Sequence, residues 1–289
     1  MPGARWWSPA EGTRTIMPGR AQPLRIGSVS YLNAKPLIAG LEDDPGVRLL
    51  LDVPSRLLDG LRDHRLDVAL LPVIDYQRLP GLQLIPAGGI CCDGPTFTVR
   101  IFSTVPIEAI RTLACDTDSH SSVALASILL AERHGTSPRL VDLTPASARE
   151  ADAILLIGDK VIQHRPAHGT LELDLGQEWK QMTGLPFVFA AWMARGGTVP
   201  DDLPMQLAEA RRRGVAGVET IISRFAPLHG WPAELARTYL TRYLQYEITD
   251  RHLEAIRRFH ALAAEHGLLE HPPWDLTVGR LQAATREGG

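Results

Sequence analysis

The chain repeats one order of hydrophobic and polar positions, and each repeat predicts the same set of elements. A short apolar run at residues 26–29 leads into a polar turn at 30–33, and a helical pattern follows at 37–41. A second apolar run at 113–115 leads into a polar turn at 116–122 and then into a strong helical pattern. Open α/β folds bind ligands at the sheet edge where parallel strands end. We therefore expect two similar α/β lobes with a cleft between them.

The same periodicities predict the remaining elements. Strands are predicted at residues 47–51, 66–73, 82–86, 97–102, 151–159 and 187–192, and helices at 56–65, 123–133, 204–225, 232–247 and 249–266, with a short helix opening at 144. Ser55 and Thr249 are predicted as helix N-caps, and Gly135 as a C-terminal stop.

Two of the predicted strands, at 97–102 and 187–192, are placed where the chain can change lobe. Two such crossovers form a natural hinge. The expected organisation is a disordered N-terminal tail at residues 1–23, a discontinuous first lobe at 24–98 and 192–289 that includes the C-terminal helices, and a second lobe at 99–191.

Composition and charge narrow the class of partner. Of the 289 residues, 45% are hydrophobic and 22% are charged, and the net charge is −3. No clustered basic patch indicates nucleic acid, and no apolar run approaches the roughly 20 residues of a membrane helix. Residues 1–23 lack the apolar segment of a secretory signal. We expect a cytoplasmic protein, a monomer or a homodimer, that acts on a small molecule.

Three cysteines, Cys91, Cys92 and Cys115, have no spacing typical of a disulfide framework or a zinc site. Buried free thiols in a reducing compartment are the expected state. The ten histidines form no metal-binding motif, so no metal site is expected. The sequence also contains no nucleophile elbow, no P-loop and no dinucleotide fingerprint.

Candidate site residues lie at the first polar turn and at the first crossover. Ser30, Tyr31 and Asn33 offer hydroxyl and amide groups without a permanent charge, which suits a small polar substrate. Thr98 can project its hydroxyl into the cleft from the hinge, although threonine is also simply a good strand former.

The second polar turn carries a candidate anion site. Ser119, Ser121 and Ser122 stand at the start of a predicted helix, where backbone N–H groups and the helix dipole favour a negative charge. Ordinary N-capping explains one serine there but does not require three. His120 is placed for acid–base work or for charge complementation.

Asp159 follows a buried strand, where a carboxylate can bind substrate, act as a base or orient one. It can equally pair with Lys160 or cap the next turn, and from the residues alone this structural role is favoured.

Several segments, taken in order, resemble one known family. The chain has Ser-Tyr-Leu-Asn after the first strand, Asp93-Gly94-Pro95 before the crossover, the serine-rich helix start, Leu156-Ile157-Gly158-Asp159, and Asp174-Leu175-Gly176 followed by Trp179 and Thr183-Gly184-Leu185-Pro186-Phe187. Together they resemble the chorismate dehydratases of the futalosine route to menaquinone. The resemblance covers roughly residues 24 to 259.

This resemblance implies a two-lobed, periplasmic-binding-protein-like (type II) fold that acts as a lyase without a metal or organic cofactor. The implied reaction converts chorismate to 3-[(1-carboxyvinyl)oxy]benzoate and water. By position, Asn33 matches the cleft asparagine of the family, and Thr98 stands where related sequences often have serine. Ser121 and Ser122 match a Thr/Ser-Ser pair, and His120 stands where an arginine can occur. Asn33 and Thr98 are therefore the implied catalytic residues.

Two other functions stay open at this point. The two-lobed fold most often serves non-catalytic solute-binding proteins, but the missing export signal argues against that function. The sister enzyme, 1,4-dihydroxy-6-naphthoate synthase, has a different first turn, Ser-Pro-Cys-Pro-Asn-Asp, and is the weaker alternative.

Overall fold

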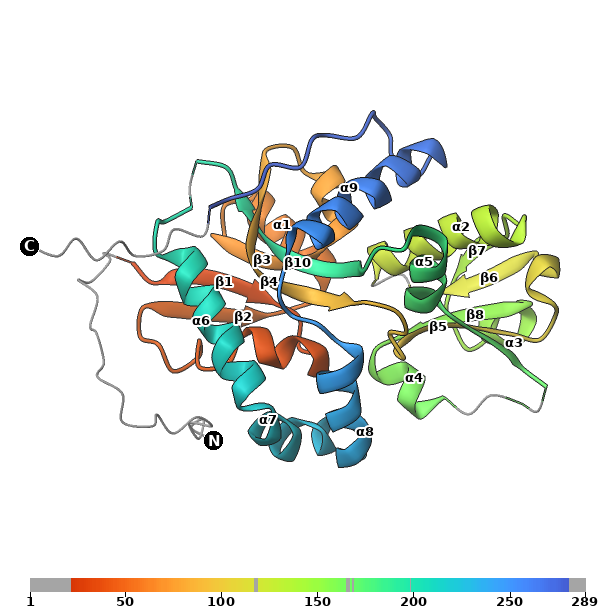
Figure 1. Ribbon diagram of the computed structural model, residues 1–289, viewed down its shortest axis with the longest axis horizontal. Coiled ribbons are helices and arrows are strands. Elements are labelled where there is room, and N and C mark those ends of the chain that lie inside the picture. The colour runs from red at the N-terminus through yellow and green to blue at the C-terminus, as the bar shows by residue number, and fades with distance from the viewer. Residues whose placement is uncertain (1–21, 117–118, 165–166, 168, 198, 281–289) are drawn as a thin grey trace, which may run out of the picture.

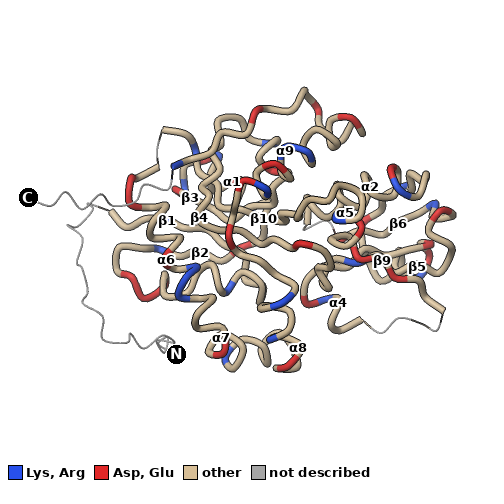
Figure 2. The backbone as a smooth tube through the Cα atoms, in the orientation of Figure 1, with Lys and Arg blue, Asp and Glu red and all other residues tan. Residues whose placement is uncertain are grey.

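The computed structural model describes residues 22–116, 119–164, 167, 169–197 and 199–280, so the tail expected at the N-terminus lies outside the described residues except for its last two positions. Two five-stranded sheets, each with helices packed on it, lie side by side (Figure 1). Lys and Arg are interspersed with Asp and Glu over both lobes (Figure 2).

The sheet of the first lobe has the strand order β2-β1-β3-β10-β4. Its strands are β1 (Leu24–Ser28), β2 (Val47–Leu51), β3 (Val68–Pro72), β4 (Leu82–Cys92) and β10 (Phe187–Arg195). The first three strands run parallel, and β10 pairs antiparallel with both β3 and β4. Every residue of β3 is buried, as expected for a central strand with both faces covered.

The sheet of the second lobe has the order β7-β6-β8-β5-β9. Its strands are β5 (Val99–Ser103), β6 (Thr112–Cys115), β7 (Arg139–Asp142), β8 (Ala153–Ile157) and β9 (Leu171–Asp174). Strands β6, β7 and β8 are parallel, and β5 runs antiparallel to β8 and β9. The two sheets therefore share one plan, with parallel strands and a connecting strand of opposite direction.

Helices cover both sheets. They are α1 (Pro54–Arg62), α2 (His120–His134), α3 (Ser147–Glu150), α4 (Asp159–Gln163), α5 (Leu175–Thr183), α6 (Leu203–Ala216), α7 (Val218–Phe225), α8 (Ala233–Thr238) and α9 (Asp250–Glu265). Short 3-10 helices are η1 (Leu32–Leu37), η2 (Val73–Arg78), η3 (Ile107–Ala109) and η4 (Pro227–His229), and η5 (Tyr239–Tyr243) is a π-helix. Helices α6, α7 and α8 follow one another along the first lobe (Figure 1).

Helix ends test the sequence predictions in detail. Thr249 is the N-cap of α9 and forms a reciprocal capping box with His252, and Gly135 ends α2 in the left-handed conformation, so both predictions are confirmed. The prediction of Ser55 as an N-cap is wrong, because Pro54 already occupies the first turn of α1 and Val53 precedes it.

Three predicted helices differ from the structure in form. The helix expected at 37–41 is instead η1, which starts at Leu32 and contains Pro36. The long helix expected at 204–225 is divided at Gly217 into α6 and α7. The helix expected at 232–247 consists of α8 followed by η5, and the backbone is extended from Leu244.

The chain passes between the lobes at two places. After β4 it crosses to β5, and it returns through β10, which begins at Phe187 within the first sheet. The lobe boundary expected at residue 192 stays a prediction, but β10 already pairs with β4 from its first residue.

One glycine fixes how the C-terminal helices lie on the first lobe. A side chain at Gly214 of α6 would overlap the backbone of Pro36 in η1. Because glycine has no Cβ, α6 can lie directly on η1. This contact sets the position of η1, which carries Asn33.

Candidate functional site

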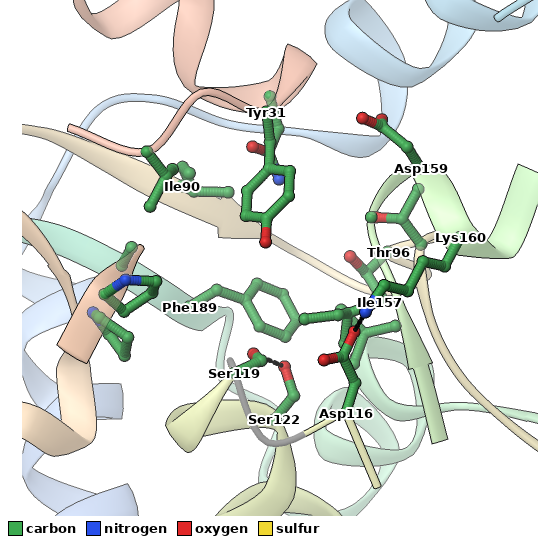
Figure 3. A pocket seen from close by; sticks show the side chains of 18 of the residues that line it. Tyr31, Ile90, Thr96, Asp116, Ser119, Ser122, Ile157, Asp159, Lys160 and Phe189 are labelled. Carbon is green, nitrogen blue, oxygen red and sulfur yellow. Dashed lines mark hydrogen bonds and ion pairs between the residues drawn. The ribbon is translucent and has the colours of Figure 1, made fainter. Parts of the chain in front are cut away.

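A pocket lies between the two lobes and encloses about 810 Å³ of space, part of it open to solvent. The described polar residues that line it are Tyr31, Asn33, Thr96, Thr98, Asp116, Ser119, Ser122, Asp159, Lys160 and Tyr239, and its apolar lining includes Ile90, Ile157 and Phe189 (Figure 3). Part of the lining lies at or just after the C-terminal ends of β1, β3, β6 and β8, the edge at which open α/β sheets bind ligands.

Asn33 reaches the pocket from η1. Its Nδ2 donates a hydrogen bond to the Tyr239 hydroxyl at 3.3 Å. Its Oδ1 is buried and has no hydrogen-bond partner among the described residues. A buried amide oxygen without a partner is costly, so this atom is an acceptor available to a ligand.

Thr98 is held by an unusual backbone segment just before β5. The Asp174 carboxylate accepts hydrogen bonds from the backbone N–H groups of Thr96 and Phe97, at 2.9 and 2.8 Å. Phe97 has a φ of 66°, a conformation that is rare for a bulky residue and that clusters at functional sites. The Thr98 side chain is buried, and its Oγ1 lies 2.7 Å from the Tyr239 hydroxyl oxygen.

Tyr239 is the residue that joins Asn33 to Thr98. It lies in η5, and π-helical turns are frequent at functional sites. Its ring stacks on Trp231 with centroids 4.8 Å apart. Burial raises the pKa of Tyr239, so its hydroxyl stays protonated at neutral pH.

The serine-rich start of α2 divides its side chains between two directions. Ser119 and Ser122 line the pocket, and the Ser119 hydroxyl donates to Ser122 Oγ at 2.7 Å. Ser121 Oγ instead accepts a hydrogen bond from the backbone N–H of Ile74 in η2 at 3.2 Å. Residues three apart share a helix face, whereas their neighbours point elsewhere.

His120 also faces the first lobe. Its Nδ1 lies 2.7 Å from Oδ1 of Asp75, which is fully buried in η2, and His120 is not among the residues that line the pocket. Together with Ser121, this contact fastens the start of α2 to the first lobe.

Charged groups occupy the second-lobe side of the pocket. The Lys160 ammonium forms an ion pair with Asp116 at 2.5 Å (Figure 3). Asp159 accepts hydrogen bonds from His229 Nδ1 at 2.7 Å and from Trp231 Nε1 at 2.6 Å. Both pocket carboxylates are therefore engaged by protein partners.

The structure brings together six of the nine residues that the sequence indicates for the site. Those that line the pocket are Tyr31, Asn33, Thr98, Ser119, Ser122 and Asp159. Ser30 is exposed and does not line the pocket, and His120 and Ser121 contact η2. The anticipated Asp159–Lys160 pair is replaced by an Asp116–Lys160 pair.

Sequence reasoning missed Tyr239, Phe189 and the pocket-facing role of Lys160. Tyr239 is 141 residues from Thr98 along the chain, and no motif surrounds it. Asp116 begins the second polar turn, so the sequence indicated its position at the end of a strand but did not indicate its ion pair with Lys160.

The remaining candidate chemistry in the chain is structural. All three cysteines are buried and free, as predicted, and burial raises the pKa of Cys91 well above that of an ordinary thiol. Within the described residues, no group of three or more His, Cys, Asp or Glu side chains is arranged to hold a metal ion. None of the helices in the described part of the chain combines the length and the apolarity needed to cross a membrane.

Comparison with known sequences identifies relatives over most of the chain. A family model described as menaquinone biosynthesis matches residues 24–265. The chorismate dehydratase of Thermus thermophilus is 30% identical over 246 residues, which cover 77% of this chain and 89% of that protein. The chorismate dehydratase of Campylobacter jejuni is 25% identical over 244 residues, which cover 81% of this chain and 95% of the relative.

Comparison with solved structures concerns the fold. A protein from Archaeoglobus fulgidus superposes with a TM-score of 0.69 at 16% identity, over 86% of this chain and 99% of that one. The periplasmic aliphatic sulphonate binding protein SsuA from Escherichia coli gives a TM-score of 0.63 at 16% identity, over 93% and 98% of the two chains. These similarities confirm the expected two-lobed, periplasmic-binding-protein-like α/β fold.

Proposed function

This chain belongs to the menaquinone biosynthesis family, and we propose that it is a chorismate dehydratase. The reaction is the conversion of chorismate to 3-[(1-carboxyvinyl)oxy]benzoate and water in the futalosine route. The similarity to two chorismate dehydratases over about four fifths of the chain supports this assignment. The enzyme is a cytoplasmic hydro-lyase, and its buried free thiols suit that reducing compartment.

The observation that carries the proposal is the contrast between the two walls of the pocket. The uncharged wall consists of Tyr31, Asn33, Thr98 and Tyr239, and the charged wall consists of Asp116, Ser119, Ser122, Asp159 and Lys160. Chorismate has two carboxylates and one ring hydroxyl. The charged wall offers Lys160 and the start of α2 to a carboxylate, and the uncharged wall offers an amide and hydroxyls to the ring hydroxyl.

The chemistry requires few protein groups. The ring carbon that bears the enolpyruvyl ether loses a proton, and the neighbouring carbon loses its hydroxyl. The proton and the hydroxyl together become the released water, and the electron pair of the broken C–H bond completes a benzene ring. Asn33 and Thr98 hydrogen-bond the departing hydroxyl and the enolpyruvyl group, and this positioning lowers the barrier.

The base is a carboxylate of the substrate itself. The two carboxylates in the pocket lining are both occupied, Asp116 by Lys160 and Asp159 by His229 and Trp231. Neither is available to take a ring proton without breaking its pair. The enzyme therefore orients the substrate, with Asn33 fixing its conformer, and supplies no side-chain base of its own.

Ultraviolet absorbance of chorismate mixed with the purified protein tests this function. We expect chorismate to disappear and an aromatic product with the mass of 3-[(1-carboxyvinyl)oxy]benzoate to appear on chromatography, at a rate unchanged after dialysis against a chelator. Tight binding of unchanged chorismate would instead identify a solute-binding protein. If the protein neither binds nor converts chorismate, then chorismate is excluded as its ligand.

A further inference from the structure

One phenolic oxygen joins three segments that are far apart in the sequence. The Tyr239 hydroxyl oxygen accepts from Asn33 Nδ2 at 3.3 Å and lies 2.7 Å from Thr98 Oγ1. Asn33 comes from η1, Thr98 from the crossover to the second lobe, and Tyr239 from the C-terminal helices. Tyr239 is only 1% exposed, so its hydroxyl depends on these two partners for its hydrogen bonds.

The direction of the hydrogen bond between Tyr239 and Thr98 follows from counting hydrogens. A phenol has one hydrogen to donate and can accept more than one bond. Among the described residues, Thr98 Oγ1 is the acceptor within reach of that hydrogen. If Thr98 donated to Tyr239 instead, the phenolic hydrogen would be buried without an acceptor, which costs more than the bond returns. With the amide nitrogen of Asn33 facing the same phenolic oxygen, the count favours Tyr239 as the donor to Thr98.

This direction decides what Thr98 and Asn33 present to a ligand. With its oxygen already accepting from Tyr239, the Thr98 hydroxyl has its own hydrogen free for another partner. Asn33 has its amide N–H committed to Tyr239, and its Oδ1 is buried without a partner among the described residues. One free donor and one free acceptor stand on either side of the same phenolic oxygen. An alcohol, which both accepts and donates, matches that pair.

We propose that Tyr239 is a positioning residue that orients Thr98 and Asn33 as a donor–acceptor pair for a hydroxyl group of the substrate. This inference rests on the proposed function, because chorismate has such a hydroxyl and its dehydrated product does not. The Thr98 hydroxyl donates to the oxygen that leaves, and Asn33 Oδ1 holds its hydrogen. Tyr239 itself does not touch the reacting atoms.

The test is a double-mutant cycle with a matched control. Tyr239→Phe removes the phenolic oxygen and keeps the ring that stacks on Trp231. Thr98→Val removes the hydroxyl at equal volume, and Thr98→Ser keeps it. The control is Tyr246→Phe, because Tyr246 is also buried, its hydroxyl has no partner among the described residues, and it does not line the pocket. Turnover of chorismate and binding of the dehydrated product are measured for each variant.

We expect Tyr239→Phe to lower kcat about tenfold and Thr98→Val about thirtyfold, since each removes a hydrogen bond that orients the leaving group. In the Thr98→Val background, Tyr239→Phe should lower kcat clearly less than it does in the wild-type protein, because the part of its effect that passes through Thr98 is already lost and only the part that passes through Asn33 remains. Product affinity should fall much less than kcat in every variant, because the product lacks the hydroxyl. Thr98→Ser should recover most of the turnover that Thr98→Val loses, and Tyr246→Phe should keep near-normal turnover.

The inference would be overturned if the decrease in kcat in the double variant equalled the product of the decreases in the two single variants. It would also be overturned if Tyr239→Phe weakened the binding of product and of substrate equally. If Tyr239→Phe fails to fold, near-normal turnover in Thr98→Val overturns the inference, and a loss that only Thr98→Ser restores supports it. If the wild-type protein does not convert chorismate, the proposed function is wrong. This outcome differs from a failure of the inference about Tyr239, in which the wild-type protein is active and only the variants behave otherwise than expected.

Discussion

The uncharged wall and the charged wall hold their polar groups in different ways. On the uncharged wall, Asn33 and Thr98 are joined through neutral hydrogen bonds to the buried Tyr239 hydroxyl. On the charged wall, Lys160 pairs with Asp116, and the Lys160 side chain remains half exposed. The hydrogen bonds of the uncharged wall meet at a buried hydroxyl, whereas the cation of the charged wall is in contact with water.

This difference indicates that one wall fixes the geometry of a bound substrate and that the other attracts its charge. Neutral hydrogen bonds that are buried keep their partners, because breaking one leaves a polar atom unpaired. An ammonium has three hydrogens to donate, so the half-exposed Lys160 can bind a substrate carboxylate while it stays paired with the buried Asp116. We therefore expect changes on the uncharged wall to alter mainly kcat and changes on the charged wall to alter mainly KM.

The largest expected effect is that of Asn33→Ala on the uncharged wall. Removing one preorganised polar group from an active site typically costs about 10²–10³ in rate. We expect kcat for chorismate to fall by about that factor, with KM changed much less, as measured by initial rates over a range of chorismate concentrations. Thermal melting of the variant controls for misfolding. Wild-type turnover in a folded Asn33→Ala protein would end the role assigned to this residue.

The second effect concerns the support of the charged wall at low pH. His260 is 2% exposed and bonds the Val73 carbonyl and Gln77 of η2, the helix on which the start of α2 rests. Desolvation lowers the pKa of His260 to about 4, against about 6.5 for an ordinary histidine. Below pH 6.5 the unfolded chain therefore takes up a proton that the folded chain does not.

The contribution of His260 to folding stability should then be fully present above pH 6.5 and should fall as the pH drops toward 4, by up to about 3 kcal/mol. Urea unfolding from pH 7 to 4 measures this slope. His260→Gln should flatten it, whereas the same change at the exposed His64 should leave it intact. An unaltered slope in His260→Gln would assign the pH dependence to other groups.

Much of the fold is readable from local patterns. Nearly all central strands were predicted, because long apolar runs such as that of β3 need no knowledge of their neighbours. The failures arise where tertiary contacts override the local pattern. In η1, Pro36 and the close approach of Gly214 favour a 3-10 turn in place of the α-helix that the apolar spacing suggests.

The site was readable wherever a turn follows a strand and hidden wherever two distant segments meet. Asn33 and Ser119 lie at strand-end turns, so their position at the sheet edge follows from sequence order. Ser121 was expected beside Ser122, but helix geometry turns it toward Ile74, which no sequence pattern identifies as its neighbour. Tyr239 reaches the pocket only through the packing of the C-terminal helices.

A smaller effect should separate the two members of the ion pair on the charged wall. Lys160 is the one cation among the described pocket-lining residues. We expect Lys160→Met to raise KM about tenfold with little change in kcat, because one charge-assisted contact is lost. Asp116→Asn should lower KM about threefold, because it frees Lys160 and removes a negative charge. Steady-state kinetics at low and moderate salt measure KM for both variants. If KM changed in the same direction in both, Lys160 would not be the group that binds a substrate carboxylate.

The smallest effect should distinguish the two faces of the first turn of α2. Ser119 lines the pocket, and Ser121 holds the backbone N–H of Ile74. We expect Ser119→Ala to raise KM about threefold and to leave stability unchanged. Ser121→Ala leaves a buried N–H unpaired, so it should cost about 1 kcal/mol of stability and change KM little. Thermal melting and kinetics on both variants check the pair. The reverse result would place the substrate against Ser121, and the charged wall would then extend toward the first lobe, where His120 and Asp75 already meet.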